Sequence, residues 1–100
     1  MGHVHGSFKP QLHIDGQVAA ETVEYAVAKV ETALHHAPSP VLRVRLCLRQ
    51  VACTAAAERG QARVDVDLNG AYVGAHAAGT TMREAVDRMQ DRLRACLARR

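Results

Sequence analysis

The apolar residues of this chain change their period in a fixed order, which predicts six elements of secondary structure. Alternation over residues 11–15 and 41–50 is typical of strands with one apolar face. From residue 18 to 36 the period becomes helical, and it is helical again over residues 82–97. Two more alternating runs flank the Asn69-Gly70 pair, which is typical of a tight hairpin because both residues accept a positive φ. The predicted order is therefore β-α-β-β-β-α.

Each predicted helix has one apolar stripe, and the clearest predicted strand has one apolar face. The stripe of the first helix consists of valine, leucine and alanine: Val23, Val27, Val30, Leu34, Ala26 and Ala33. The strand at 41–50 is expected to direct four residues inward: Leu42, Val44, Leu46 and Leu48. The final helix, capped by Thr80 or Thr81, presents Met82, Val86, Met89, Leu93 and Leu97. This pattern predicts an α+β two-layer sandwich, with two helices packed on one face of a four-stranded sheet.

The length of 100 residues suits one hydrophobic core, so we expect a single domain. We assign residues 1–10 to a flexible leader and residues 11–100 to the domain, with a mobile hairpin loop over residues 51–60. No apolar run is long enough to cross a bilayer, and the first residues lack the apolar core of a signal peptide. Three cysteines without close spacing are expected to be reduced thiols: Cys47, Cys53 and Cys96. These features predict a cytoplasmic protein with no membrane partner.

Basic residues gather at the C-terminal end of the chain. The whole chain holds 13 Lys and Arg against 10 Asp and Glu, a net charge of +3. Residues 1–40 contain two basic residues and four acidic ones, whereas residues 81–100 contain six arginines and three acidic residues. This asymmetry indicates an anionic partner, either nucleic acid or an acidic protein.

The arginines of the final helix fall on two borders of its apolar stripe. At 100° per residue, Arg88, Arg92 and Arg99 share one narrow sector. Glu84 can pair with Arg88, but Arg92 and Arg99 have no acidic residue three or four positions away. The other border combines two arginines with two aspartates: Arg83, Arg94, Asp87 and Asp91. The first sector is either a solvated helix face or a ridge whose guanidinium groups bind phosphate oxygens.

Short motifs in both helices resemble the ribosome hibernation-promoting factor family, which includes the ribosome-associated inhibitors once called sigma-54 modulation proteins. Members of that family commonly carry E-Y-x-x-x-K-L in the first helix, N-G before the last strand, and A-I-D-x-x-x-x-K-L in the last helix. The matching residues in the first helix are Glu24, Tyr25, Lys29 and Val30. Those in the last helix are Ala85, Val86, Asp87, Arg92, Leu93 and, for a later lysine, Arg99. The resemblance spans residues 11–100 and shares the predicted order of elements.

The resemblance implies a stress-related ribosome hibernation factor. Such a protein binds the small ribosomal subunit, through 16S rRNA, in the cleft for mRNA and tRNA anticodons, and thereby inhibits translation. By position, the phosphate contacts of the family fall on Lys29, Arg88, Arg92 and Arg99. With the remaining arginines of the basic end, the candidate RNA-binding residues are Lys29, Arg83, Arg88, Arg92, Arg94, Arg99 and Arg100.

Other residues have two readings each. Four arginines lie on the expected open face of the sheet: Arg43, Arg45, Arg49 and Arg63. They either pair across strands with Asp65 and Asp67 or form a second phosphate patch. Tyr25 is either a packing residue or an RNA contact. With only Phe8, Tyr25 and Tyr72 as aromatic residues, the chain is poorly suited to stacking bases, which favours recognition of rRNA shape and phosphate.

The sequence offers no candidate nucleophile, carboxylate pair or phosphate-cradling glycine loop, so we expect neither an enzyme nor a cofactor. His35 and His36 are adjacent on a helix end and point apart, which argues against a shared metal site. DNA is not an expected partner. The alternative to ribosome binding is a small protein-interaction module that forms a homodimer through the open sheet face or an edge strand.

Overall fold

The computed structural model describes residues 10–35, 37, 40–51, 59–69 and 71–99. The elements in chain order are β1 (Gln11–Asp15), α1 (Ala20–Leu34), β2 (Val41–Gln50), β3 (Gly60–Leu68), β4 (Ala71–Gly79) and α2 (Met82–Ala98). This order confirms the predicted β-α-β-β-β-α arrangement. The predicted leader, apart from Pro10, and most of the predicted hairpin loop lie outside the described residues.

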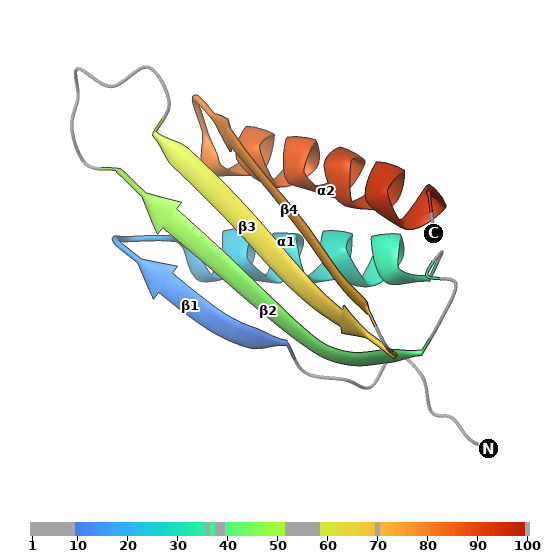
Figure 1. The fold of residues 1–100 in the computed structure, drawn as a ribbon. Helices are drawn as coiled ribbons and strands as arrows, with labels where there is room; N and C mark the ends of the chain where they lie inside the picture. Colours follow the sequence, from blue (N-terminus) through green and yellow to red (C-terminus); the bar gives the residue numbers. More distant parts are fainter. Residues whose placement is uncertain (1–9, 36, 38–39, 52–58, 70, 100) are drawn as a thin grey trace.

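The four strands form one mixed sheet in the order β1-β2-β3-β4. Strand β1 pairs with β2 in parallel, whereas β2, β3 and β4 pair antiparallel. Because a parallel pair needs a crossover, α1 carries the chain from β1 to β2 along one face of the sheet. Both helices lie on that face, and the other face is turned toward the reader in Figure 1. The α+β two-layer sandwich is therefore confirmed.

The hydrophobic core lies between the sheet and α2. Alternate residues of β2, β3 and β4 point toward the helices, and α2 packs on β3 and β4. The predicted stripe of α2 is fully confirmed, because all of its members are buried: Met82, Val86, Met89, Leu93 and Leu97. The first helix packs chiefly against α2 and touches the sheet mainly at β2. Its most buried residues are therefore the small Ala26 and Ala33 together with Val30, while Val23 and Val27 are only partly buried.

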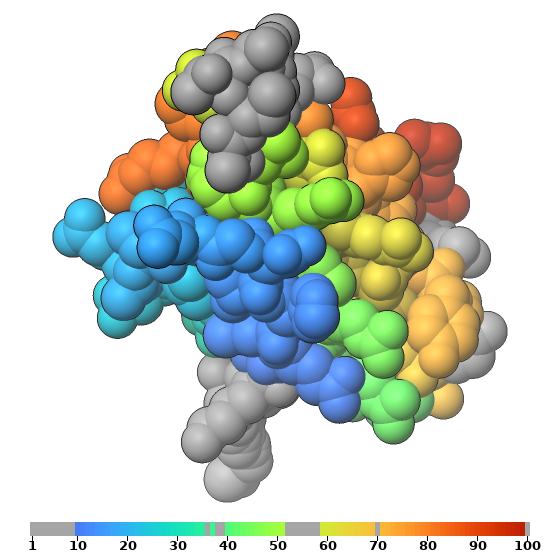
Figure 2. Space-filling model, turned by 90° about the vertical axis from the view of Figure 1, so that its left-hand side faces the viewer, coloured from blue at the N-terminus to red at the C-terminus, as the bar shows by residue number. Residues whose placement is uncertain are grey.

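The sheet extends beyond the helices at β1. Leu12 and Ile14 pair in register with the buried Leu46 and Leu48, yet they are 47% and 38% exposed. Figure 2 shows the blue surface of β1 open beside the cyan surface of α1. The prediction that Leu42 points into the core was wrong, since this side chain is 62% exposed. The cause is a register shift between Val41 and Arg43, which interrupts the alternation at the start of β2.

Strands β3 and β4 form the hairpin that the Asn69-Gly70 pair predicted, because Leu68 pairs with Ala71. The predicted backbone geometry of Asn69 was wrong, since no described residue other than glycine has a positive φ. Gly70 lies outside the described residues.

Candidate nucleic-acid interface

The start of α2 is fixed by hydrogen bonds among Thr80, Thr81 and Glu84. Thr81 caps the helix, and its Oγ1 accepts a hydrogen bond from the backbone N–H of Glu84 at 3.1 Å. Glu84 Oε1 accepts in return from the backbone N–H of Thr80 at 2.7 Å and from its hydroxyl at 3.0 Å. The backbone bond from Thr80 is the main reason that the pKa of Glu84 lies below its ordinary value. The arginines that follow are therefore presented in a defined direction.

Three side chains of α2 reach the free edge of β4 and bind its carbonyl groups in turn. Arg88 Nη1 donates to the carbonyl of Ala78 at 2.9 Å, and Arg92 Nη1 donates to that of His76 at 2.6 Å. Cys96 Sγ donates to the carbonyl of Gly74 at 3.9 Å. The three donor residues are spaced four apart on the helix, a rise of about 6 Å per step. The three acceptor carbonyls are spaced two apart on the strand, about 6.7 Å per step, so donors and acceptors stay aligned along the edge. These side chains therefore cover part of an edge that would otherwise be open.

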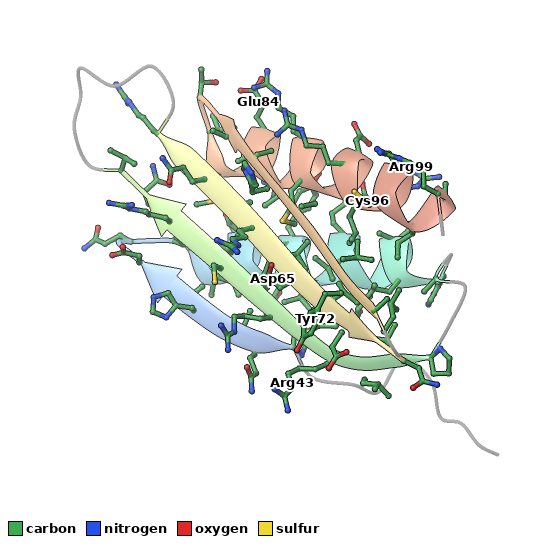
Figure 3. All side chains as sticks on the ribbon, in the orientation of Figure 1. Arg43, Asp65, Tyr72, Glu84, Cys96 and Arg99 are labelled. Atoms are coloured by element: carbon green, nitrogen blue, oxygen red, sulfur yellow. The ribbon has the colours of Figure 1, made fainter. Side chains whose placement is uncertain are left out.

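Arg99 continues this line toward the end of α2. Together with Cys96, Tyr72 and Gly74 it lines a hollow of about 340 Å³. In Figure 3, Glu84, Cys96 and Arg99 mark the course of α2 from its first turn to its end. We call Arg88, Arg92 and Arg99 the β4 arginine row. The structure thus brings together the three arginines that the helical wheel placed in one sector.

The β4 arginine row is incompletely neutralised. Arg88 Nη2 lies 3.3 Å from Glu84 Oε2, in an ion pair between residues four positions apart on the helix. Neither Arg92 nor Arg99 forms an ion pair with an acidic side chain in the part of the chain that the structure describes. Arg92 donates to the carbonyl of His76 through Nη1, and the other N–H groups of its guanidinium are left to bind further acceptors.

Two other candidate residues belong to the junction between the helices. Lys29 Nζ lies 3.7 Å from Asp87 Oδ1, and the same oxygen accepts a hydrogen bond from the Tyr25 hydroxyl at 2.5 Å. The Tyr25 ring also receives two cations, with Arg83 Cζ 4.5 Å and Lys29 Nζ 5.3 Å from its centroid. The structure shows packing contacts for Tyr25, and an RNA contact of this residue stays a prediction. Lys29 and Arg83 therefore have structural partners apart from the β4 arginine row.

The remaining candidate residues do not join either group. Arg94 is exposed and forms no hydrogen bond or ion pair with the described residues. Arg100 lies outside the described residues. The candidate set therefore divides into a row beside β4 and a helix junction, with Arg94 separate from both.

The open face of the sheet carries the four arginines that the alternation placed there. Arg45 stands opposite Asp65, and Arg43 stands opposite Asp67. The predicted cross-strand ion pairs are nevertheless absent among the described residues, because Asp65 Oδ2 instead lies 3.3 Å from Nε of Arg63 on its own strand. The fourth arginine, Arg49, reaches an acid that the prediction left out. Its Nε lies 3.6 Å from Asp15 Oδ2 on β1.

A hollow of about 670 Å³ opens on this face of the sheet. Its lining includes Arg49 and Arg63 from the strands together with Arg88 and Arg92 from α2. Sequence reasoning assigned these arginines to two unrelated surfaces. No local signal could have joined them, because their meeting depends on where α2 lies beside β4.

Within the described residues, no three histidine, cysteine, aspartate or glutamate side chains come together as a metal site. Cys47 and Cys96 are free thiols and half-buried, while Cys53 and His36 lie outside the described residues. Neither described helix is long and apolar enough to span a membrane.

No protein-family model and no curated protein matches this sequence. Solved structures share its fold, including the following two. The N-terminal domain of Protein Y from Thermus thermophilus is 19% identical, with a TM-score of 0.72 over 92% of this chain and 98% of that domain. A ribosomal subunit interface protein from Coxiella burnetii is 18% identical, with a TM-score of 0.63 over 89% of this chain and 94% of that protein. These structures establish the fold, and they are consistent with the resemblance to the ribosome hibernation-promoting factor family.

Proposed function

We propose that this protein binds the small ribosomal subunit through 16S rRNA and inhibits translation by occupying the cleft for mRNA and tRNA. The observation that carries the proposal is the β4 arginine row, set on a fold that is shared with a ribosomal subunit interface protein. The family resemblance of both helices supports the same function.

The row has the chemistry that binding to RNA phosphate requires. A guanidinium group has five N–H donors, and the bonds of Arg88 and Arg92 to β4 use only some of them. Those bonds also orient each side chain, so less freedom is lost when a phosphate is bound. Placing Arg92 and Arg99 beside phosphate creates charge-assisted bonds and releases counterions.

Inhibition by this route needs only occupancy. A folded domain in the cleft excludes mRNA and tRNA by its volume, and its arginines compete for the same phosphates. The proposed mechanism therefore has no catalytic step and uses no cofactor.

The two edges of the sheet are not equally suited to the competing homodimer. Side chains of α2 cover the edge of β4, whereas β1 leaves its edge and the side chains of Leu12 and Ile14 exposed. A homodimer formed by strand addition would therefore use β1. This alternative predicts dimers in solution whose stability does not depend on Arg92 or Arg99.

Co-sedimentation with purified small ribosomal subunits tests the proposal. We expect the full chain to pellet with the subunits at low salt and to be released as salt rises. In the double variant Arg92→Gln/Arg99→Gln, the slope of log affinity against log salt should fall by about 2, because about one counterion is released per phosphate contact. Glutamine is preferred to glutamate because it removes the positive charge without adding a negative one.

The matched control is Arg43→Gln/Arg45→Gln, which removes the same charge from the open face of the sheet. We expect this variant to keep nearly the affinity and salt slope of the original chain. Equal losses in both double variants would show that overall charge, and not the β4 arginine row, causes association. If the original chain forms dimers and fails to pellet at any salt concentration, the proposed function is wrong.

A further inference from the structure

The hollow of about 670 Å³ on the open face brings together cations from three elements. Arg49 lies on β2, Arg63 on β3, and Arg88 and Arg92 on α2, while the one carboxylate among the lining residues is that of Asp15. This site spans the sheet and is not confined to the helix surface.

Strand register explains why these residues meet. His13, Cys47, Arg63 and His76 stand side by side in one row across all four strands. The neighbouring row contains Arg49 opposite Gln61, and Gln61 opposite Ala78. On β4 these rows end at His76 and the small Ala78, whose carbonyl groups accept the hydrogen bonds of Arg92 and Arg88 from α2. The resulting space falls within the range typical of sites for small molecules, about 300–1,000 Å³.

The carboxylates close to these arginines are weak competitors for an anion. The Arg49–Asp15 pair is solvent-exposed on both sides, with side-chain exposures of 64% and 62%. The side chains of Arg63 and Asp65 are 65% and 32% exposed, and those of Arg88 and Glu84 are 51% and 39% exposed. Exposed ion pairs of this kind contribute little stability, so a phosphate can replace the carboxylates with bidentate bonds of its own.

Other ligand classes fit the hollow less well. Its histidines, thiol and carboxylate do not gather as a metal site within the described residues. No Phe, Tyr or Trp side chain is among its described lining residues, so a base could stack only on imidazole or guanidinium planes. What it does provide is guanidinium groups from the sheet and from α2, with His76 of β4 between them and His13 of β1 at the far side as further hydrogen-bonding groups.

We propose that this hollow is a phosphate-binding site, in which Arg49 and Arg63 of the sheet and Arg88 and Arg92 of α2 hold one phosphate-bearing ligand. The phosphate comes either from a free phosphorylated compound or from an RNA backbone. The site goes beyond the β4 arginine row and does not require ribosome binding.

The test uses the full ¹⁵N-labelled chain, titrated with inorganic pyrophosphate and separately with a short oligouridylate, and followed by NMR. With pyrophosphate, the largest shift changes are expected in the backbone amides of His13, Arg63 and His76. The variant Arg49→Gln/Arg63→Gln should weaken pyrophosphate binding on the order of tenfold or more, because two charge-assisted contacts are lost. Arg43→Gln/Arg45→Gln, with the same charge change on the same face, should bind almost as the original chain does.

The two probes also identify the source of the phosphate. Competition between them, with both weakened by Arg49→Gln/Arg63→Gln, supports an RNA backbone in the hollow. Pyrophosphate binding in the hollow, with oligouridylate binding unchanged by that variant, supports a free phosphorylated compound. The proposal is overturned if pyrophosphate does not bind, if both double variants lose affinity equally, or if the shift changes lie away from the hollow.

Failure here is separable from failure of the proposed function. A chain that pellets with small subunits but ignores pyrophosphate would reject the hollow and leave ribosome binding intact. A chain that binds pyrophosphate in the hollow but never pellets with small subunits would support the phosphate site and reject ribosome binding.

Discussion

The basic side chains of this protein differ in their intramolecular contacts, even when they lie on the same helix. Arg83 stacks on the Tyr25 ring, whereas Arg92 binds a strand carbonyl. Arg99 forms no ion pair with the described residues. Arg83 loses its contact with the Tyr25 ring if it turns toward a phosphate, whereas Arg92 can bind one with donors that its bond to His76 leaves unused. Under the proposed function, the intramolecular partners of each arginine, and not its charge alone, decide how readily it binds phosphate.

Glu84 leads to a prediction about pH. Its folded-state pKa is below the ordinary value of 4.5, chiefly through the hydrogen bond from the Thr80 backbone. A lowered folded pKa means that the unfolded chain binds the proton first, so the stabilisation is present above pH 4.5 and is lost as pH falls through the folded pKa. The melting temperature of the original chain should therefore exceed that of Glu84→Gln near neutral pH.

Thermal melts followed by circular dichroism over a series of pH values measure this difference. The gap between the two chains should narrow as the pH falls below 4.5, because the original carboxyl then becomes neutral too. A gap of constant size across the series would show that charge at Glu84 does not stabilise the start of α2.

At the scale of elements, α2 and β4 are joined at both ends and along their length. The capping bonds fix the first turn, the arginines and Cys96 bind the strand edge, and the apolar stripe packs on β3 and β4. Gly60 and Gly79, which pair in register, lie directly beneath the first turn of the helix. A Cβ at Gly60 would lie 2.7 Å from Cα of Met82 and 2.8 Å from its nitrogen. The helix approaches the sheet this closely only because these positions lack side chains.

Gly60→Ala should therefore destabilise the protein by about 1–3 kcal/mol, since the added methyl meets backbone atoms that cannot turn aside. Urea unfolding measures the loss. Gly74→Ala is the matched control on the same sheet, because its Cβ would meet the mobile end of the Asp65 side chain at 3.1 Å. We expect that variant to change stability little. Equal losses at Gly60 and Gly74 would refute the close packing of the first turn.

Across the whole molecule, the two layers are offset. The helices cover β2, β3 and β4 well but leave β1 partly open, so burial differs sharply between neighbouring strands. Leu12 and Leu46 make this plain, because they are paired in register yet one is 47% exposed and the other fully buried. The open sheet face and the covered β4 edge together place the positive hollow on the side away from the core.

This offset predicts unequal costs for the same substitution. Leu46→Ala should cost about 2–5 kcal/mol, because it leaves a cavity in the packed core. Leu12→Ala should cost roughly 1 kcal/mol or less, since half of that side chain already meets water. Urea unfolding of both variants provides the comparison. Similar losses would mean that β1 is covered as well as β2.

The order of elements, the stripe of α2 and a cap at Thr80 or Thr81 followed from the sequence alone, because hydrophobic period and capping chemistry are local properties. The structure decided for Thr81. Local pattern also placed Arg88, Arg92 and Arg99 on one side of a helix. It could not say that Leu42 leaves the core or that Lys29 meets Asp87. Nor could it bring Arg49 and Arg92 to one hollow. Those outcomes depend on how much of the sheet α1 covers and on the edge of the sheet beside which α2 lies. Both are decided by packing between elements that are distant in sequence.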